Sequence, residues 1–133
     1  EPTQGTLANP AAGVNLNIDG TARVMAYPIA INFTFTTDAN VANRRMILKL
    51  GSDTFDFVVV IAQTVQTASL AWKYFFNLDG QLDQLTGLNY MLRLPRIVCP
   101  SSIVIDTAIE NIQVGDQISA FRWIYGQRLQ GVT

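Results

Sequence analysis

The chain contains no histidine and only one cysteine. Histidine is the commonest general base and a common metal ligand, so its absence excludes Ser-His-Asp and Cys-His catalytic sites. The single cysteine, Cys99, excludes an internal disulfide and a sulfur-rich zinc site, and is most simply a small buried hydrophobe. No phosphate-cradling glycine motif is present either. We therefore expect a protein that is not an enzyme and holds no metal or cofactor.

Charge is also scarce, because only 14% of the 133 residues are charged while 49% are hydrophobic. A typical soluble domain carries about a quarter charged residues. Charge depletion marks the centres of protein interfaces, so the composition favours assembly. The net charge of −1 gives no basis for binding nucleic acid, and the longest apolar run, 57–62, is too short to cross a membrane. Several arginines lie near one another, and we expect them to form surface salt bridges, with phosphate binding as the alternative. They are Arg44, Arg45, Arg93, Arg96, Arg122 and Arg128.

Short segments with an alternating apolar pattern recur along the chain, and no helix-length period interrupts them. The length fits one domain. We predict an all-β fold, an antiparallel β-sandwich or jelly roll. Residues 54–63 are apolar on both faces in their second half, which predicts a central strand, and 81–85 suit one helical turn. The predicted strands are 27–36, 45–50, 54–63, 70–76, 88–94, 103–107 and 117–125.

The first 22 residues differ from the rest, since they are rich in proline, glycine and small polar residues. Val14, Leu16 and Ile18 alternate with polar residues and form a short apolar stripe. We interpret residues 1–22 as an extended N-terminal arm and 23–133 as the β-sandwich domain; a disordered terminus is the alternative. An apolar stripe of this kind predicts an interface with a partner.

The last predicted strand is apolar on both faces. Phe121, Trp123 and Tyr125 share one face of it, and Ile118, Ala120 and Ile124 share the other face with Arg122. One face faces the core, so the other needs a cover, which is either another part of the same fold or a second subunit. Large aromatic side chains provide much contact area for little entropy, so we predict that Phe121, Trp123 and Tyr125 form an oligomer interface.

Three stretches resemble a known class of proteins. They are Ile31-Asn32-Phe33-Thr34-Phe35-Thr36-Thr37 running on through 40–45, Leu94-Pro95-Arg96-Ile97, and Ile112-Gln113-Val114-Gly115-Asp116-Gln117-Ile118. Together they resemble small virion proteins of tailed bacteriophages, and the Gly115-Asp116 turn is also similar to trimeric jelly rolls of the tumour-necrosis-factor type. The resemblance covers residues 27–125 and implies a capsid decoration (cement) protein with a jelly-roll fold.

This resemblance sets the expected function. We expect a homotrimer on the capsid exterior that binds the major capsid protein between capsomers, with the stripe of the arm, Val14, Leu16 and Ile18, contacting the capsid. Neither nucleic acid nor a membrane is an expected partner. A carbohydrate- or receptor-binding β-sandwich is the alternative, and a tail or head–tail adaptor subunit is a third possibility. In a carbohydrate- or receptor-binding module, the aromatic side chains that stack on the ligand would be Trp72, Tyr74, Trp123 or Tyr125.

Overall fold

The computed structural model describes residues 2–6, 9–19, 24–51, 56–78, 80, 83–95 and 104–129. Only the backbone is described for 2–6, 18–19, 24–28, 56 and 125–129. Within these ranges the chain forms ten β-strands and no helix. The predicted all-β class is therefore confirmed for the described part of the chain.

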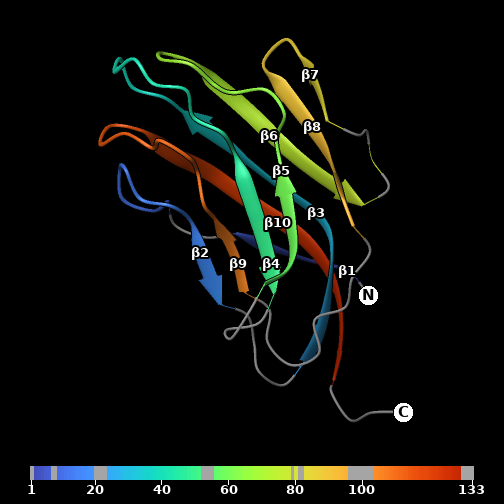
Figure 1. Ribbon diagram of the computed structural model, residues 1–133. Helices are drawn as coiled ribbons and strands as arrows, with labels where there is room; N and C mark the ends of the chain where they lie inside the picture. The colour runs from blue at the N-terminus through green and yellow to red at the C-terminus, as the bar shows by residue number, and fades with distance from the viewer. Residues whose placement is uncertain are drawn as a thin grey trace.

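The strands form two sheets, which lie one in front of the other in Figure 1. Every neighbouring pair is antiparallel except β6 and β8, which run parallel. The larger sheet has the order β1 (Pro2–Thr6), β10 (Gln117–Leu129), β3 (Val24–Thr36), β6 (Ala71–Leu78), β8 (Asn89–Leu94) and β7 (Gln84–Thr86). The smaller sheet has the order β2 (Asn17–Asp19), β9 (Val104–Thr107), β4 (Ile47–Gly51) and β5 (Asp56–Ile61). The architecture is sandwich-like.

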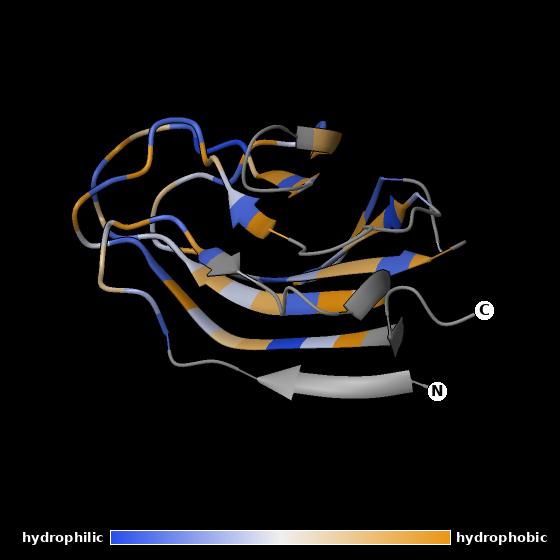
Figure 2. Cartoon of the chain, turned by 90° about the horizontal axis from the view of Figure 1, so that it is seen from below, coloured by the Kyte–Doolittle hydropathy of each residue, from blue (hydrophilic) through white to orange (hydrophobic). Residues whose placement is uncertain are grey.

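One core lies between the sheets, as expected when two sheets each turn an apolar face inward. The alternation of hydrophilic and hydrophobic residues that produces it is visible along the strands in Figure 2. A row of aromatic rings crosses the larger sheet: Phe121 and Phe33 have centroids 6.4 Å apart, Phe33 and Tyr74 5.8 Å, and Tyr74 and Tyr90 5.4 Å. Such cross-strand aromatic pairs each contribute about 0.5–1.5 kcal/mol beyond area burial. The smaller sheet supplies Leu48, Leu50 and Ile105.

Two predictions about single elements were wrong. β5 is an edge strand of the smaller sheet, and Phe57, Val59 and Ile61 are 46%, 48% and 50% exposed. The double-sided apolar pattern therefore reflects an uncovered outer face, because a run of valines reads the same whether its second face is covered or not. Of the predicted helical turn 81–85, residues 81–82 lie outside the described ranges, and the described part leads into the short strand β7, which pairs with β8 at the other end of the larger sheet.

A β-bulge explains the apolar pattern of the last strand. Ser119 pairs with Thr34 and Arg122 with Asn32, so β10 has one extra residue at this point. Ala120, at the extra position, has a φ of 54°, which non-glycine residues adopt rarely. The extra residue exchanges the faces of the strand, and residues of both sets are buried: Ile118, Phe121 and Trp123. Their presence in one core accounts for the pattern without a second subunit.

The N-terminal segment is paired with both sheets. β1 pairs antiparallel with β10, from Pro2 opposite Gly126 to Thr6 opposite Arg122. β2 pairs antiparallel with β9, and Leu16 just before it is 3% exposed. A separate extended arm is thus not confirmed, because main-chain hydrogen bonds place parts of residues 1–22 in the sheets.

Candidate functional site

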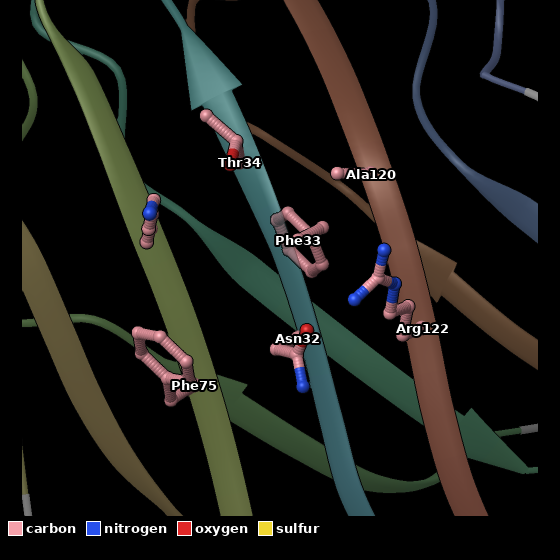
Figure 3. A pocket seen from close by; sticks show the side chains of 7 residues that line it. Asn32, Phe33, Thr34, Phe75, Ala120 and Arg122 are labelled. Atoms are coloured by element: carbon pink, nitrogen blue, oxygen red, sulfur yellow. The ribbon is translucent and has the colours of Figure 1, made fainter. Parts of the chain in front are cut away.

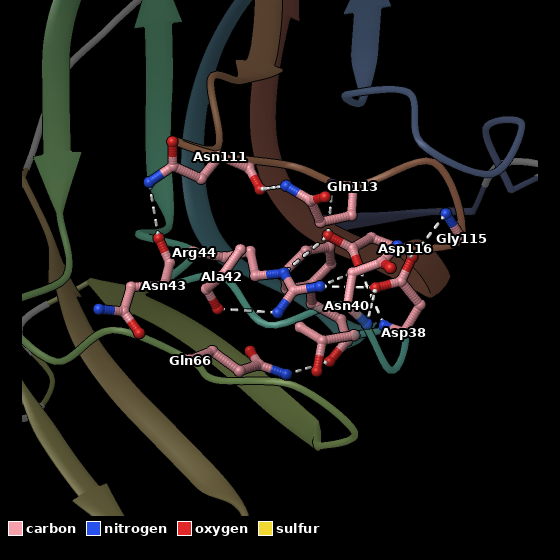
Figure 4. Close-up of polar contacts among 12 residues, drawn as sticks. Asp38, Asn40, Ala42, Asn43, Arg44, Gln66, Asn111, Gln113, Gly115 and Asp116 are labelled. Atoms are coloured by element: carbon pink, nitrogen blue, oxygen red, sulfur yellow. Dashed lines mark hydrogen bonds and ion pairs between the residues drawn. The ribbon is translucent and has the colours of Figure 1, made fainter.

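A buried charged cluster lies among the loops that join the two sheets (Figure 4). Its centre is Arg44, which is fully buried, and it brings together Asp38 from the β3–β4 loop and Asp116 from the β9–β10 loop. The guanidinium donates from Nε to Asp116 Oδ2 at 3.0 Å, and from Nη2 to Asp38 Oδ1 at 2.7 Å and Asp116 Oδ1 at 3.1 Å. Its Nη1 donates to the Ala42 carbonyl at 2.8 Å. The planar fork of arginine suits this arrangement better than the point charge of lysine would.

The carboxylates also accept hydrogen bonds from the backbone. Asp116 accepts from the amides of Asp38 at 2.8 Å and Gln113 at 2.7 Å. Asp38 accepts from the amides of Asn40 at 3.0 Å and Gly115 at 2.9 Å. A Cβ at Gly115 would lie 2.8 Å from Asp38 Oδ2, so only glycine permits this approach.

The hydrogen bonds determine the ionisation of Asp38. Desolvation raises its pKa, but the bonds from Asn40 and Gly115, together with the charge of Arg44, outweigh that effect and hold the pKa below its usual value. Asp38 therefore stays ionised at neutral pH, as an ion pair with Arg44 requires.

The backbone of Arg44 ties a third loop to the cluster. Its amide and carbonyl pair with Gln66 of the β5–β6 loop at 3.0 and 2.7 Å. The Gln66 side chain donates to the Phe35 carbonyl at 2.8 Å and accepts from the Tyr74 hydroxyl at 2.9 Å. The charged and amide groups of this cluster have partners in one another and in the loop backbones, so the cluster fastens the loops together. We therefore assign it a structural role.

Sequence reasoning missed this cluster. Arg44 was expected in a surface salt bridge, but it is buried; that prediction was wrong for this residue. Its neighbour Arg45 does pair on the surface, with Glu110 at 3.4 Å. The signal was ambiguous, because adjacent arginines look alike and Asp38 and Asp116 both lie in segments where aspartate is common for turn geometry.

A second buried polar contact joins β8 to the segment before β7. The Tyr90 hydroxyl donates to Asp83 Oδ1 and accepts from the Thr64 amide at 2.9 Å, and Asp83 Oδ2 accepts from the Gln63 amide at 2.8 Å. Burial and the bond to Asp83 raise the pKa of Tyr90, and burial raises that of Tyr74. Both hydroxyls therefore remain protonated in the folded chain well into alkaline pH.

The predicted interface residues lie in different surroundings. Val14 is 51% exposed, but Leu16 is buried and exchanges hydrogen bonds with Thr107, its amide to Thr107 Oγ1 at 2.9 Å and its carbonyl from the Thr107 amide at 3.0 Å. The side chain of Ile18 lies outside the described residues. Phe121 and Trp123 belong to the core, and the side chain of Tyr125 is also not described. These placements do not test a contact with a capsid or a second subunit, so both roles stay predictions.

Two further surface features lie outside the two polar clusters. The first is the β5 stripe, defined by Phe57, Val59 and Ile61 on the outer face of an edge strand. The second is a hollow of about 220 Å³ on the outer face of the larger sheet (Figure 3). Its lining comprises Asn32, Phe33, Thr34, Lys73, Phe75, Ala120 and Arg122.

Within the described ranges, no group of three or more potential metal-ligating side chains occurs, and no helix suited to crossing a membrane is found. Cys99 lies outside these ranges. No family model, no curated protein and no solved structure matches this chain significantly.

Proposed function

We propose that this chain is a structural subunit of a virion, a capsid decoration protein built on a jelly roll. The observation that carries the proposal is the strand order. With the β7–β8 hairpin set aside, the chain places strands β1-β10-β3-β6 in one sheet and β2-β9-β4-β5 in the other. Eight strands in two sheets, with the chain crossing repeatedly between them, are typical of the double Greek key of jelly rolls, a fold used by viral capsid and lectin domains.

The β5 stripe supports assembly. β5 carries no lysine or proline that would block edge pairing, and its described outward side chains are all apolar. Natural proteins usually protect such an edge with charges or bulges. In β5 the aspartate and the register shift lie at its first end, so the apolar remainder, 58–61, lacks this protection and favours a contact with another subunit. In the proposed particle, the stripe contacts either a second copy in a homotrimer or the major capsid protein on the exterior of the shell.

The N-terminal segment would contact the capsid as part of the folded domain, because β1 and β2 are paired into the two sheets. Ala11, Ala12 and Val14 are exposed in the loop before β2, whereas Leu16 is buried, so the exposed part of this loop is what a capsid could contact. An arm that swings free of the domain would first have to break the pairing of β1 and β2.

Electron microscopy of purified particles with and without the protein tests the role. The proposal predicts added density at regular positions on the outside of the shell when the protein is present. Particles of unchanged appearance, with the protein recovered only in the unbound fraction, would refute it.

Self-association is tested separately by sedimentation of the Val59→Glu variant, whose new carboxylate would lie opposite Lys49 on β4, with Val41→Glu in the exposed β3–β4 loop as a matched control. Val59 is 48% exposed, so the change should leave the fold intact and shift the oligomer toward the monomer. Wild-type protein that is already monomeric at high micromolar concentration would remove the homotrimer from the proposal and leave the capsid contact as the only use of the stripe.

A carbohydrate-binding role is the second candidate, since jelly rolls also serve lectins. Three of the four stacking platforms expected from the sequence, Trp72, Tyr74 and Trp123, are at most 8% exposed. They are therefore unable to stack on a sugar in this conformation. A sugar could instead stack on Phe75, which lines the hollow of the larger sheet beside polar side chains.

A further inference from the structure

We infer that the hollow on the larger sheet is a binding site for a carboxylate. This inference does not depend on the proposed virion role. Of the described residues that line the hollow, two are cations, Lys73 on β6 and Arg122 on β10, and none is acidic. Figure 3 shows Arg122 beside Ala120 and Asn32.

The two cations lie on one face of the sheet. Lys73 is opposite Thr34 and Arg122 is opposite Asn32, and these two β3 residues are two apart, so their side chains point the same way. Both cationic side chains are exposed, and neither has a hydrogen bond or ion pair within the described part of the chain. Two like charges on one surface repel each other, so a bound anion would lower the energy of both.

The scarcity of acids extends to the whole sheet. The six strands of the larger sheet contain Lys73, Arg93, Arg122 and Arg128, and no aspartate or glutamate. Four acidic side chains outside these strands have other partners: Asp38 and Asp116 pair with Arg44, Glu110 pairs with Arg45, and Asp83 accepts a hydrogen bond from Tyr90. An intramolecular partner for the two cations is therefore absent from the described strands.

The bulge in β10 creates the site. Without the extra residue, Arg122 would share the inward face with Ile118, four positions before it. With the extra residue, Phe121 and Trp123 are buried and Arg122 is exposed above Asn32. The small side chain of Ala120 at the bulge leaves the hollow open, and its amide is held by Asn9 Oδ1 at 3.2 Å. Bulges that redirect a side chain are common beside binding sites, and a non-glycine residue at positive φ points the same way.

The lining selects a carboxylate over a phosphate. Phosphate sites use several free backbone amides, at a helix N-terminus or a nest. Here the floor is β3, which is hydrogen-bonded to β10 and β6 on its two sides, so its amides are not directed into the hollow. The guanidinium of Arg122 matches a planar carboxylate, the ammonium of Lys73 adds the second charge, and the half-buried ring of Phe75 provides an apolar wall for the carbon chain.

The test is a titration of the full-length protein, labelled with nitrogen-15, with sodium glutarate at constant ionic strength. We expect saturable amide shifts that centre on Asn32, Lys73, Ala120 and Arg122. Arg122→Gln should weaken binding about tenfold or more, the usual effect of losing a charged hydrogen bond. Arg93→Gln, which removes the same charge from the same sheet outside the hollow, should leave the affinity within about twofold, the change expected for a screened charge.

A second arm identifies the source of the carboxylate. A short glutamate-containing peptide that binds more tightly than glutarate would assign the site to an acidic side chain of a neighbouring protein, and the reverse order would assign it to a free carboxylic acid. Shifts that do not saturate, an Arg122→Gln variant that binds as well as wild type, or inorganic phosphate that binds as tightly as glutarate would each overturn the inference.

Discussion

Replacing Arg44 with methionine should destabilise the protein strongly. The substitution keeps an unbranched side chain of similar length but removes four hydrogen bonds, three of them to the carboxylates of Asp38 and Asp116. The Asp116 carboxylate would then be buried without its cation, because its side chain is 0% exposed. Removing one partner of a buried ion pair typically costs about 3–5 kcal/mol.

This loss of stability is large relative to the total free energy of unfolding. A domain of this kind has a free energy of unfolding of about 5–15 kcal/mol, so Arg44→Met should lower the melting temperature by about 10 °C or more. Urea denaturation followed by circular dichroism measures the change, and an unaltered m-value would show that the unfolded state is the same.

The neighbouring residue gives a matched control. Arg45 pairs with Glu110 on the surface, where the two side chains are 32% and 56% exposed, and its Nη1 donates to the carbonyls of Ala62 and Gln63 at 2.7 and 2.8 Å. An exposed ion pair contributes about 0–1 kcal/mol, and replacing Arg45 leaves no buried carboxylate without its cation. Arg45→Met should therefore cost several-fold less than Arg44→Met. Equal costs for the two variants would show that the buried cluster does not fasten the loops, and would refute the argument made from burial.

Three further predictions concern the whole chain. Deleting residues 1–20 should destabilise the domain or prevent folding, because β1 and β2 are removed from β10 and β9 and the buried Leu16 is lost; a truncated chain with an unchanged circular dichroism melt would show that these pairings contribute little. Among the four tyrosines, Tyr74 and Tyr90 should titrate above the usual value near 10 in an absorbance titration. Because the pKa of each buried hydroxyl is higher in the folded than in the unfolded chain, its contribution to folding stability is complete below the unfolded pKa and is lost as the pH rises through the folded pKa. The protein should therefore unfold in strong alkali. Normal titration of all four tyrosines would contradict the burial of Tyr74 and Tyr90. Tyr90→Phe should keep the fold but remove the hydrogen-bond donor to Asp83 Oδ1 and the acceptor of the Thr64 amide, costing about 1–3 kcal/mol in urea denaturation; a neutral effect would show that water replaces the hydroxyl.

Much of the core follows from the sequence, because strand periodicity is a local property. Ile31, Phe33 and Phe35 alternate with polar residues, and the structure buries all three; the same holds for Trp72, Tyr74 and Phe76. An alternating segment with one apolar face has to turn that face inward wherever its neighbours are, so these residues could be predicted without knowing the pairing.

The pairing itself could not be predicted in this way. The valine-rich segment 57–61 has the same sequence pattern as a central strand, although it forms an edge strand. The sequence around Ala120 likewise contains no signal that predicts the β-bulge. A bulge of one residue exchanges the faces of everything that follows, which is why Arg122 and Trp123 were assigned to the wrong sides of the strand relative to Ile118.

The candidate sites depend on contacts between distant residues. Arg44 and Asp116 are 72 positions apart, and the hollow joins β3, β6 and β10 from across the chain. The sequence by itself determined the all-β class and most core residues, since these depend on side-chain alternation. Only the tertiary structure decided which arginine is buried, which apolar face is exposed and which cations share a surface, because each of these depends on strand order, and strand order is a non-local property of the fold.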